Sequence, residues 1–241
     1  MRILVTRPEP DAQAQAETLA ALGHEAVLAP LLIVEIVPGV PLGLNGAQAV
    51  IVTSRNALRA LADHPEREKA LQLPLFAVGE ASALKAMKVG FGDITAGTNN
   101  AQGLVALILG ALDPKAGSLV HLSGETLAFD LKSALEEQGF EVRRKILYEA
   151  VPARQLPPAA LAALREGRLD AVIFMSPRTA RTFADLLGRH DAVTQGKGLV
   201  CYCLSQAVAE VLAPLGFTVR VAESPREEDV LAMLDTGSAS S

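Results

Sequence analysis

Short apolar runs alternate with amphipathic stretches along almost the whole chain. The runs that read as buried strands are Arg2–Thr6, Glu25–Leu28, Ala49–Thr53, Leu75–Val78, Ser118–His121, Glu141–Lys145, Ala171–Met175, Leu199–Leu204 and Thr218–Val221. Between them, helical spacing of apolar residues covers Asp11–Leu22, Asn56–Ala62, Ala101–Leu112, Leu127–Gln138, Thr179–Leu187, Gln206–Leu215 and Glu227–Leu234. Strands that are apolar on both faces and alternate with helices indicate parallel sheets covered by helices. The pattern therefore predicts an α/β protein.

Three pairs of phrases repeat along the chain. "AVIVTSRNAL" from Ala49 returns as "AVIFMSPRTA" from Ala171, and "VGEASALKAMKVGF" from Val78 resembles "LSQAVAEVLAPLGF" from Leu204. The strand-helix-strand segment that begins at Thr6 has its counterpart in the middle of the chain. This order lets the middle of the chain build one complete sheet domain, while the two chain ends build the other.

The predicted division gives two flavodoxin-like parallel-sheet domains with a cleft between them. Residues 1–36 and 153–241 form domain 1, and residues 37–150 form domain 2. Two β linker strands, near 31–37 and 146–151, carry the chain across, and both runs are apolar, β-prone and followed by Pro38 or Pro152. The alternative is one larger sheet in which the similar strand-helix-strand segments arise by coincidence.

Small polar or cationic residues follow several of the predicted strands. In open parallel sheets, ligands bind beyond the carboxyl ends of the strands, next to helix N-termini. Backbone N–H groups, hydroxyls and arginines at those positions favour an anionic ligand. The residues in question are Arg7, Thr53, Ser54, Arg55, Ser82, Ser123, Gly124, Ser176 and Ser205. For any one of these residues taken alone, ordinary capping of the following helix is the favoured interpretation, whereas the six strand ends together favour a cleft that binds a polyanion.

Composition removes several classes of function. The chain has 241 residues, half of them apolar, a net charge of −5 and no Trp, which argues against sequence-independent binding to nucleic acid. It contains no phosphate-loop or dinucleotide fingerprint, no hydrolase elbow and no metal-ligand spacing among its four His. Cys201 and Cys203 face the same side of a predicted strand and read as buried core residues.

The apolar runs also bear on location. The apolar part of the N-terminal "MRILVTRP" is too short for a signal peptide, and the longest apolar run, near Leu104–Leu112, is far shorter than the roughly 20 residues a membrane span needs. We expect a cytoplasmic protein that does not enter the membrane.

Tyr148 is a further candidate because it lies in the second predicted linker strand, at the border of the predicted cleft. A phenol there could donate a hydrogen bond or act as a weak acid. The alternative is an amphipathic residue that packs the linker.

The order and spacing of seven phrases resemble the uroporphyrinogen-III synthase family over nearly the whole chain. These are "ILVTRP", "VIVTSRNAL", "FAVGEASA", "VHLSGE", "ILYEAV", "VIFMSPRTA" and "AESPREEDVLAML". The resemblance implies two α/β domains joined by a two-stranded linker, a monomer, and no metal or organic cofactor. It implies that the substrate is hydroxymethylbilane, a linear tetrapyrrole with eight carboxylates. The enzyme closes it to uroporphyrinogen III with inversion of ring D and loss of water, in the biosynthesis of haem, chlorophyll and cobalamin.

The resemblance also implies roles for single residues. Tyr148 assists departure of the substrate hydroxyl. Carboxylates are held by Thr53, Ser54, Arg55, Ser82, Ser123 and Gly124 from the middle domain and by Arg7, Ser176 and Ser205 from the other. One departure is Val208, which stands where many relatives have a threonine. A transient contact with the upstream deaminase that makes the substrate stays open.

Two other functions compete with this one. A hinge-type, non-catalytic binder of a polyanionic small molecule would share the two-domain organisation, but would bind the bilane without changing its product. A sugar or nucleotide transferase would need a phosphate loop and an acidic nucleotide anchor, and the sequence shows neither.

Overall fold

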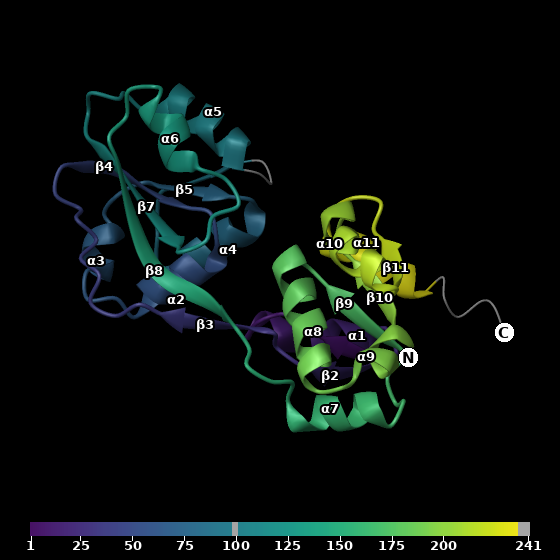
Figure 1. The fold of residues 1–241 in the computed structure, drawn as a ribbon. Coiled ribbons are helices and arrows are strands. Elements are labelled where there is room, and N and C mark those ends of the chain that lie inside the picture. The colour runs from purple at the N-terminus through teal and green to yellow at the C-terminus, as the bar shows by residue number, and fades with distance from the viewer. Residues whose placement is uncertain (98–100, 236–241) are drawn as a thin grey trace. The chain divides into compact units, whose positions relative to one another are not determined.

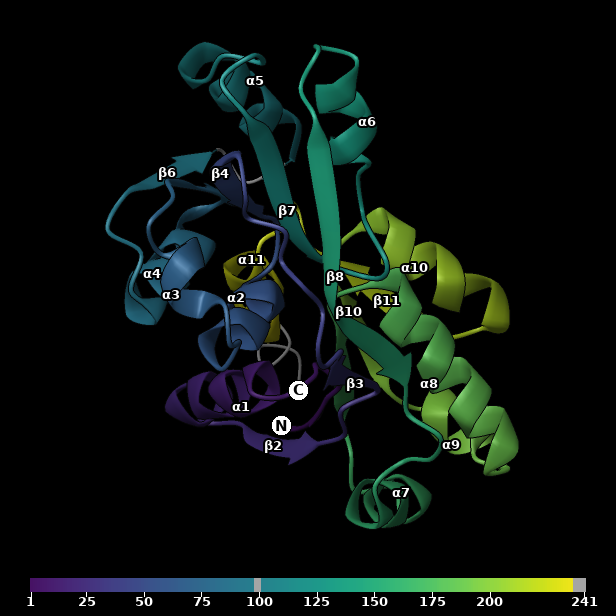
Figure 2. The same ribbon diagram turned by 90° about the vertical axis from the view of Figure 1, so that its left-hand side faces the viewer.

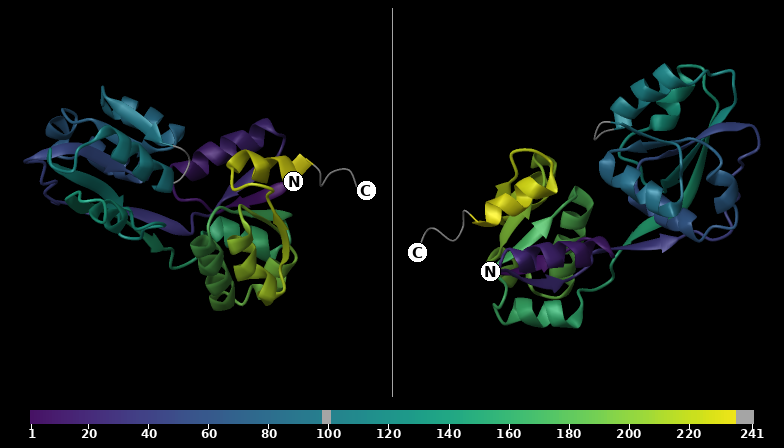
Figure 3. Two further views of the ribbon diagram at one scale, coloured as in Figure 1. Left: turned by 90° about the horizontal axis from the view of Figure 1, so that it is seen from above. Right: turned by 180° about the vertical axis from the view of Figure 1, so that it is seen from behind.

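The computed structural model describes residues 1–97 and 101–235. The chain divides into two compact units, one formed by Met1–Ile33 and Val151–Ser241 and the other by Val34–Ala150. Each unit has its own sheet (Figure 1). The purple N-terminal segment and the yellow C-terminal elements belong to one unit, and the blue and teal middle of the chain forms the other (Figure 3).

The first unit contains a five-stranded parallel sheet. Its strands are β1 (Arg2–Val5), β2 (Glu25–Leu28), β9 (Ala171–Phe174), β10 (Val200–Cys203) and β11 (Thr218–Val221), in the order β2-β1-β9-β10-β11. Its helices are α1 (Asp11–Ala21), α7 (Pro158–Arg165), α8 (Pro177–Arg189), α9 (Val193–Lys197), α10 (Gln206–Leu212) with the 3₁₀ turn η1 (Ala213–Leu215), and α11 (Glu227–Asp235). Counted within the unit, the strand order is 2-1-3-4-5, the flavodoxin order.

The second unit has a different strand order. Its sheet is β3-β8-β7-β4-β5-β6, made of β3 (Leu32–Ile36), β4 (Ala47–Val52), β5 (Leu75–Val78), β6 (Ile94–Gly97), β7 (Ser118–Gly124) and β8 (Val142–Pro152). The helices are α2 (Arg55–Ala62), α3 (Arg67–Ala70), α4 (Glu80–Val89), α5 (Ala101–Ala111) and α6 (Leu131–Glu136). The five parallel strands β4 to β8 follow the order 3-2-1-4-5, as in dinucleotide-binding folds.

The expectation of two parallel α/β sheets is confirmed, but the flavodoxin order holds only for the first unit. In the second unit the chain adds two strands, β5 and β6, on one side of β4 before it returns to β7 on the other side. In the first unit it returns after one strand. The sequence did not indicate β6, a short strand without fully buried residues at the edge of the sheet.

The predicted strand 141–145 and the linker run 146–151 form a single strand, β8, which lies along β7 and carries β3 on its other side (Figure 2). The N–H of Val37 donates to the carbonyl of Leu147 (2.9 Å), and the N–H of Ala153 donates to the carbonyl of Leu31 (3.0 Å). Residue numbers rise along one segment as they fall along the other, so β3 and β8 are antiparallel.

Both faces of the central strands of each sheet are buried, which explains the apolar character of these strands. In the first unit Leu4 and Phe174 pack on one face, while Ile3 and Ile173 pack on the other. Cys201 and Cys203 lie on the same face as free, buried thiols, as expected. Burial raises the pKa of the Cys201 thiol to about 12 and that of Cys203 to about 11.

The repeated phrases are strands followed by helix caps. Ser54 follows β4 and its Oγ accepts the N–H of Asn56 (3.2 Å), whereas Ser176 follows β9 and its Oγ accepts the N–H of Thr179 (3.1 Å). Both serines have extended backbone at the N-cap. Each such cap contributes about 1 kcal/mol to stability, so the capping interpretation is confirmed for these two residues.

The helix expected at Leu127–Gln138 begins later and ends earlier than predicted. Helix α6 covers only Leu131–Glu136, because Asp130 is its N-cap and accepts the N–H of Ser133 (3.1 Å). Residues 125–130 form a loop instead. In the described chain, no helix combines the length and the apolarity that crossing a membrane requires.

Candidate active site

A pocket of about 510 Å³ lies within the second unit. It opens at the carboxyl ends of β4, β5 and β7, where parallel sheets bind their ligands. Its lining consists of Thr53, Ser54, Val78, Ala101, Gln102, Gly124, Thr126, Leu127, Ala128, Phe129 and Tyr148. The loop 125–130, which replaces the first turns of the expected helix, forms one wall of this pocket.

Tyr148 and Gly124 are neighbours in the register of β8 and β7. A Cβ atom on Gly124 would lie 2.6 Å from Cζ and 2.9 Å from the hydroxyl oxygen of Tyr148. Real contacts of this kind are essentially never that short, so only glycine lets the tyrosine ring approach the strand so closely. Among the described residues the Tyr148 hydroxyl has no hydrogen-bond partner, although it is part of the pocket lining.

Arg144 fixes the end of β7 from the side of β8. Its Nε donates to Ser123 Oγ (2.9 Å), and its Nη2 donates to the carbonyls of Gly124 (2.7 Å) and Glu125 (2.5 Å). The Ser123 hydroxyl in turn donates to the Gly124 carbonyl (3.1 Å), and the N–H of Glu125 donates to the carbonyl of Tyr148 (3.0 Å). Ser123 is completely buried. Its hydroxyl therefore organises the strand end and is not part of the pocket lining.

A neutral histidine lies behind Thr53. His121 on β7 is completely buried, and its Nε2 lies 3.4 Å from Thr53 Oγ1. Its Nδ1 has no hydrogen-bond partner in the described part of the chain. Burial, and after it the positive charge of Arg144, lower the pKa of His121 from 6.5 to about 4, while Asp130 acts in the opposite direction. The imidazole is therefore uncharged near pH 7.

The lining contains no charged side chain, yet its electrostatics suit an anion. Ser54 is the N-cap of α2, Val78 lies just before the N-cap of α4, and Ala101 is the first residue of α5. Three helices thus begin at or beside the pocket, and a helix N-terminus carries a partial positive charge and unsatisfied N–H donors. Among residues 1–97 and 101–235, no three His, Cys, Asp or Glu side chains gather to hold a metal ion.

Of the candidates from the second unit, the pocket brings together Thr53, Ser54, Gly124 and Tyr148. Arg55 is the first residue of α2 and is half-buried, outside the pocket lining. Ser82 is buried within α4 and is not part of the lining either.

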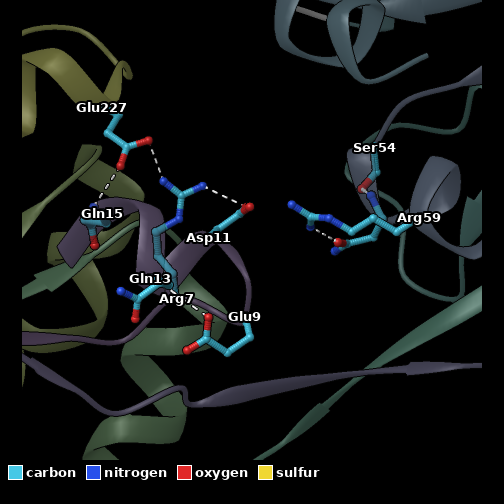
Figure 4. Close-up of polar contacts among 9 residues, drawn as sticks. Arg7, Glu9, Asp11, Gln13, Gln15, Ser54, Arg59 and Glu227 are labelled. Carbon is cyan, nitrogen blue, oxygen red and sulfur yellow. Dashed lines mark hydrogen bonds and ion pairs between the residues drawn. The ribbon is translucent and has the colours of Figure 1, made fainter. Parts of the chain in front are cut away.

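Two of the three candidates from the first unit, Arg7 and Ser176, have side-chain partners within that unit. Arg7 donates to Glu227 Oε2 (2.5 Å) and Asp11 Oδ2 (3.1 Å), and Gln15 donates to the other oxygen of Glu227 (3.0 Å) (Figure 4). The Arg7 side chain is 14% exposed, so the carboxylates of Asp11 and Glu227 balance a largely buried positive charge. Ser176 caps α8, as described above.

Ser205 occupies the N-cap of α10, but its side chain makes no capping hydrogen bond. Val208, in the first turns of the same helix, is completely buried in the core of the first unit.

Sequence reasoning missed polar residues of the pocket and the groups behind them. Thr126 belongs to "LSGET", a polar phrase at a strand end that could have marked it as a pocket residue. Gln102 stands just before an apolar helical run, and nothing in its sequence context marks it as a pocket residue. In the sequence, Arg144 is only a cationic residue within a predicted strand, and its contacts with the end of β7 could not be predicted. His121 appeared as one of four scattered histidines, and its contact with Thr53 depends on the pairing of β4 with β7.

Comparisons with known proteins point to one family. A family model described as uroporphyrinogen-III synthase HemD matches residues 13–232. The structure is similar to that of uroporphyrinogen-III synthetase from Helicobacter pylori, with a TM-score of 0.67, 18% identity and 98% coverage of both chains. A mutant uroporphyrinogen III synthase from Thermus thermophilus gives a TM-score of 0.55, 19% identity and 98% coverage of both chains. At these identities, the structural likeness supports the fold.

Proposed function

Because the chain belongs to the uroporphyrinogen-III synthase family, we propose that its linear tetrapyrrole substrate reacts in the pocket of the second unit. The chain is a cyclising lyase of tetrapyrrole biosynthesis: it closes hydroxymethylbilane to uroporphyrinogen III, inverts ring D and releases water. This family assignment favours the lyase over the hinge-type binder. The two functions differ in their product, because a binder would leave the product of spontaneous ring closure unchanged.

The observation that carries the proposed site is an uncharged pocket next to three helix N-termini. The substrate carries eight carboxylates, and a carboxylate next to a helix N-terminus is stabilised by the helix dipole and by N–H donors. Hydroxyl and amide groups of Thr53, Ser54, Gln102 and Thr126 supply further donors in the lining. These groups hold the substrate with its last ring directed toward the carbon it must attack, which is an orientation effect.

Tyr148 is the residue we assign to the departure of the hydroxyl. In this step the bond between carbon and oxygen of the hydroxymethyl group breaks, and the oxygen takes up the phenol proton and leaves as water. The pyrrole is left as an azafulvenium cation, which becomes the neutral azafulvene when its N–H proton returns to the phenolate. A phenol in the lining without an internal partner can donate to that oxygen as the bond breaks. Gly124 supports this role because it leaves room for the ring.

The remaining candidates take smaller parts in the proposal. Ser123 acts through Arg144 and the strand end, and Arg55 and Ser82 support the helices that begin near the pocket. Arg7, Ser176 and Ser205 contribute less to binding, since Arg7 is already paired with two carboxylates and Ser176 caps a helix. We further propose that the enzyme works as a cytoplasmic monomer without a cofactor and meets the deaminase only transiently.

The test generates hydroxymethylbilane in situ from porphobilinogen and deaminase, then separates the oxidised uroporphyrin isomers by chromatography. The wild-type chain should give mostly type III, whereas type I at the protein-free rate would overturn the function. Tyr148→Phe should lower the rate of type III formation by about 10²-fold or more, the usual contribution of general acid catalysis. The matched control is Tyr202→Phe, which alters the other tyrosine of the chain, buried in the first unit. Full activity of Tyr148→Phe would refute its assigned role.

A further inference from the structure

Three arginines of the first unit stand apart from all others in the described chain. Arg154, Arg181 and Arg189 make no hydrogen bond, ion pair or aromatic contact with the described residues. Every other arginine has at least one such interaction within the chain. A guanidinium carries five donors and a permanent charge, and one that has no internal partner is available to an external ligand.

All three line the same pocket, which has a volume of about 350 Å³ and lies entirely within the first unit. Helix α8 supplies Arg181 and Arg189, and the segment after β8 supplies Arg154. Arg178 from α8 also belongs to the lining. We call this pocket, defined by the four arginines, the arginine groove.

The spacing along α8 places these charges on one face. Arg178, Arg181, Asp185 and Arg189 follow one another at intervals of three or four residues, which share one side of a helix. Asp185 is the only acid in the lining, so the formal side-chain charge of the groove is +3. Arg181 and Arg189 are eight residues apart, which corresponds to about 12 Å along the helix axis.

The charge pattern is unusual for this chain, whose net charge is −5. Like charges gathered on one helix face repel each other and destabilise the fold slightly. An anion seated between them removes the repulsion and gains charge-assisted, bidentate hydrogen bonds. Because the arginines are spread over about 12 Å of the helix, an anion with two or more negative groups can engage more of them at once than a single small anion can.

We propose that the arginine groove is a second binding site, specific for an anion with several carboxylate or phosphate groups spaced along α8. The site shares no lining residue with the pocket that contains Tyr148, and it does not rest on the proposed function. Carboxylate and phosphate are the two groups whose geometry matches the guanidinium fork.

Isothermal titration of the full chain tests this proposal with two probes, tripolyphosphate and butane-1,2,3,4-tetracarboxylate, at low and near-physiological salt. We expect saturable binding of one ligand per chain, weakened by salt but still measurable. The double variant Arg181→Gln/Arg189→Gln should bind at least tenfold more weakly, because each arginine offers a charge-assisted contact. Stronger binding of one probe identifies the ligand as a phosphate or a carboxylate.

The matched control is Arg168→Gln/Arg226→Gln, which removes the same charge from two exposed arginines of the first unit that lie outside the groove. Binding to this control should stay within about twofold of the wild type. The proposal is overturned if neither probe binds the wild type saturably, or if both double variants weaken binding equally. Neither probe is a tetrapyrrole, so this result is independent of the test of catalysis.

Discussion

His121 makes the stability of the second unit depend on pH. Its pKa is lowered from 6.5 to about 4 in the folded chain, chiefly by burial. Between pH 6.5 and about pH 4 the imidazole is therefore protonated in the unfolded chain but neutral in the folded chain. The free energy of unfolding falls as the pH falls through this range. With these two pKa values the loss is about 2 kcal/mol at pH 5 and about 3 kcal/mol at pH 4. Above about pH 7.5 this group contributes almost no pH dependence.

The perturbation that tests this is His121→Gln, which removes the titrating group from β7. Urea unfolding of the wild type and the variant, followed by circular dichroism at pH 7.5 and pH 5.0, gives four free energies. The loss between the two pH values should be about 2 kcal/mol smaller for the variant than for the wild type. Comparing the two losses cancels the titration of all groups that the variant retains.

A second variant separates this effect from simple destabilisation. Leu122→Val shortens the next, completely buried residue of β7, and such substitutions remove about 1 kcal/mol without removing a titrating group. It should lower stability equally at both pH values. Equal pH dependence in the wild type and His121→Gln would refute the reasoning, since it would show that the imidazole is not held neutral by burial.

Two further predictions compare matched positions. Gly124→Ala should displace the ring of Tyr148 and lower the rate of type III formation at least tenfold in the isomer assay. Gly110→Ala, in α5 with no atom near the added methyl, should leave activity unchanged and stabilise the chain by about 0.5–1 kcal/mol. Ser176→Ala should lower the free energy of unfolding by about 1 kcal/mol. Ser205→Ala, at a similar N-cap without a side-chain hydrogen bond, should lower it by less than about 0.5 kcal/mol in the same urea titration.

The alternation of apolar runs and amphipathic stretches was enough to predict the fold class, because burial on both faces leaves a direct mark on each strand. It could not give the lateral order of the strands in the second unit. Whether β6 lies outside β5 or across β4 depends on which side the connecting helix packs, and the hydrophobic period of a helix is the same in both cases. The repeated phrases suggested two identical orders, but they describe single strand-to-helix turns, such as those at Ser54 and Ser176.

The site was predictable to the extent that it consists of strand ends. Thr53, Ser54 and Gly124 follow or end strands that are adjacent in the sheet, and Tyr148 pairs with Gly124 across β8 and β7. Ser123 shows the limit of this reasoning. It has the same sequence signature as its neighbours, yet the bulge between Ser123 and Gly124 and the contact with Arg144 bury its hydroxyl. Which way a polar side chain points is decided by tertiary contacts that the sequence does not display.

In the function we propose, the position of Arg144 explains how an uncharged pocket can hold carboxylates of a substrate that has eight of them. Its guanidinium is held by the carbonyls of Gly124 and Glu125. In a trans peptide the N–H points opposite to the preceding carbonyl, so the N–H of Thr126 points away from Arg144. The charge thus orients backbone dipoles instead of pairing with one carboxylate.

Ring inversion requires the last pyrrole to move while it stays bound. An ion pair that is as strong in the substrate as in the transition state would not accelerate that step. Donors spread over backbone, hydroxyl and amide groups can hold the carboxylates while the ring turns.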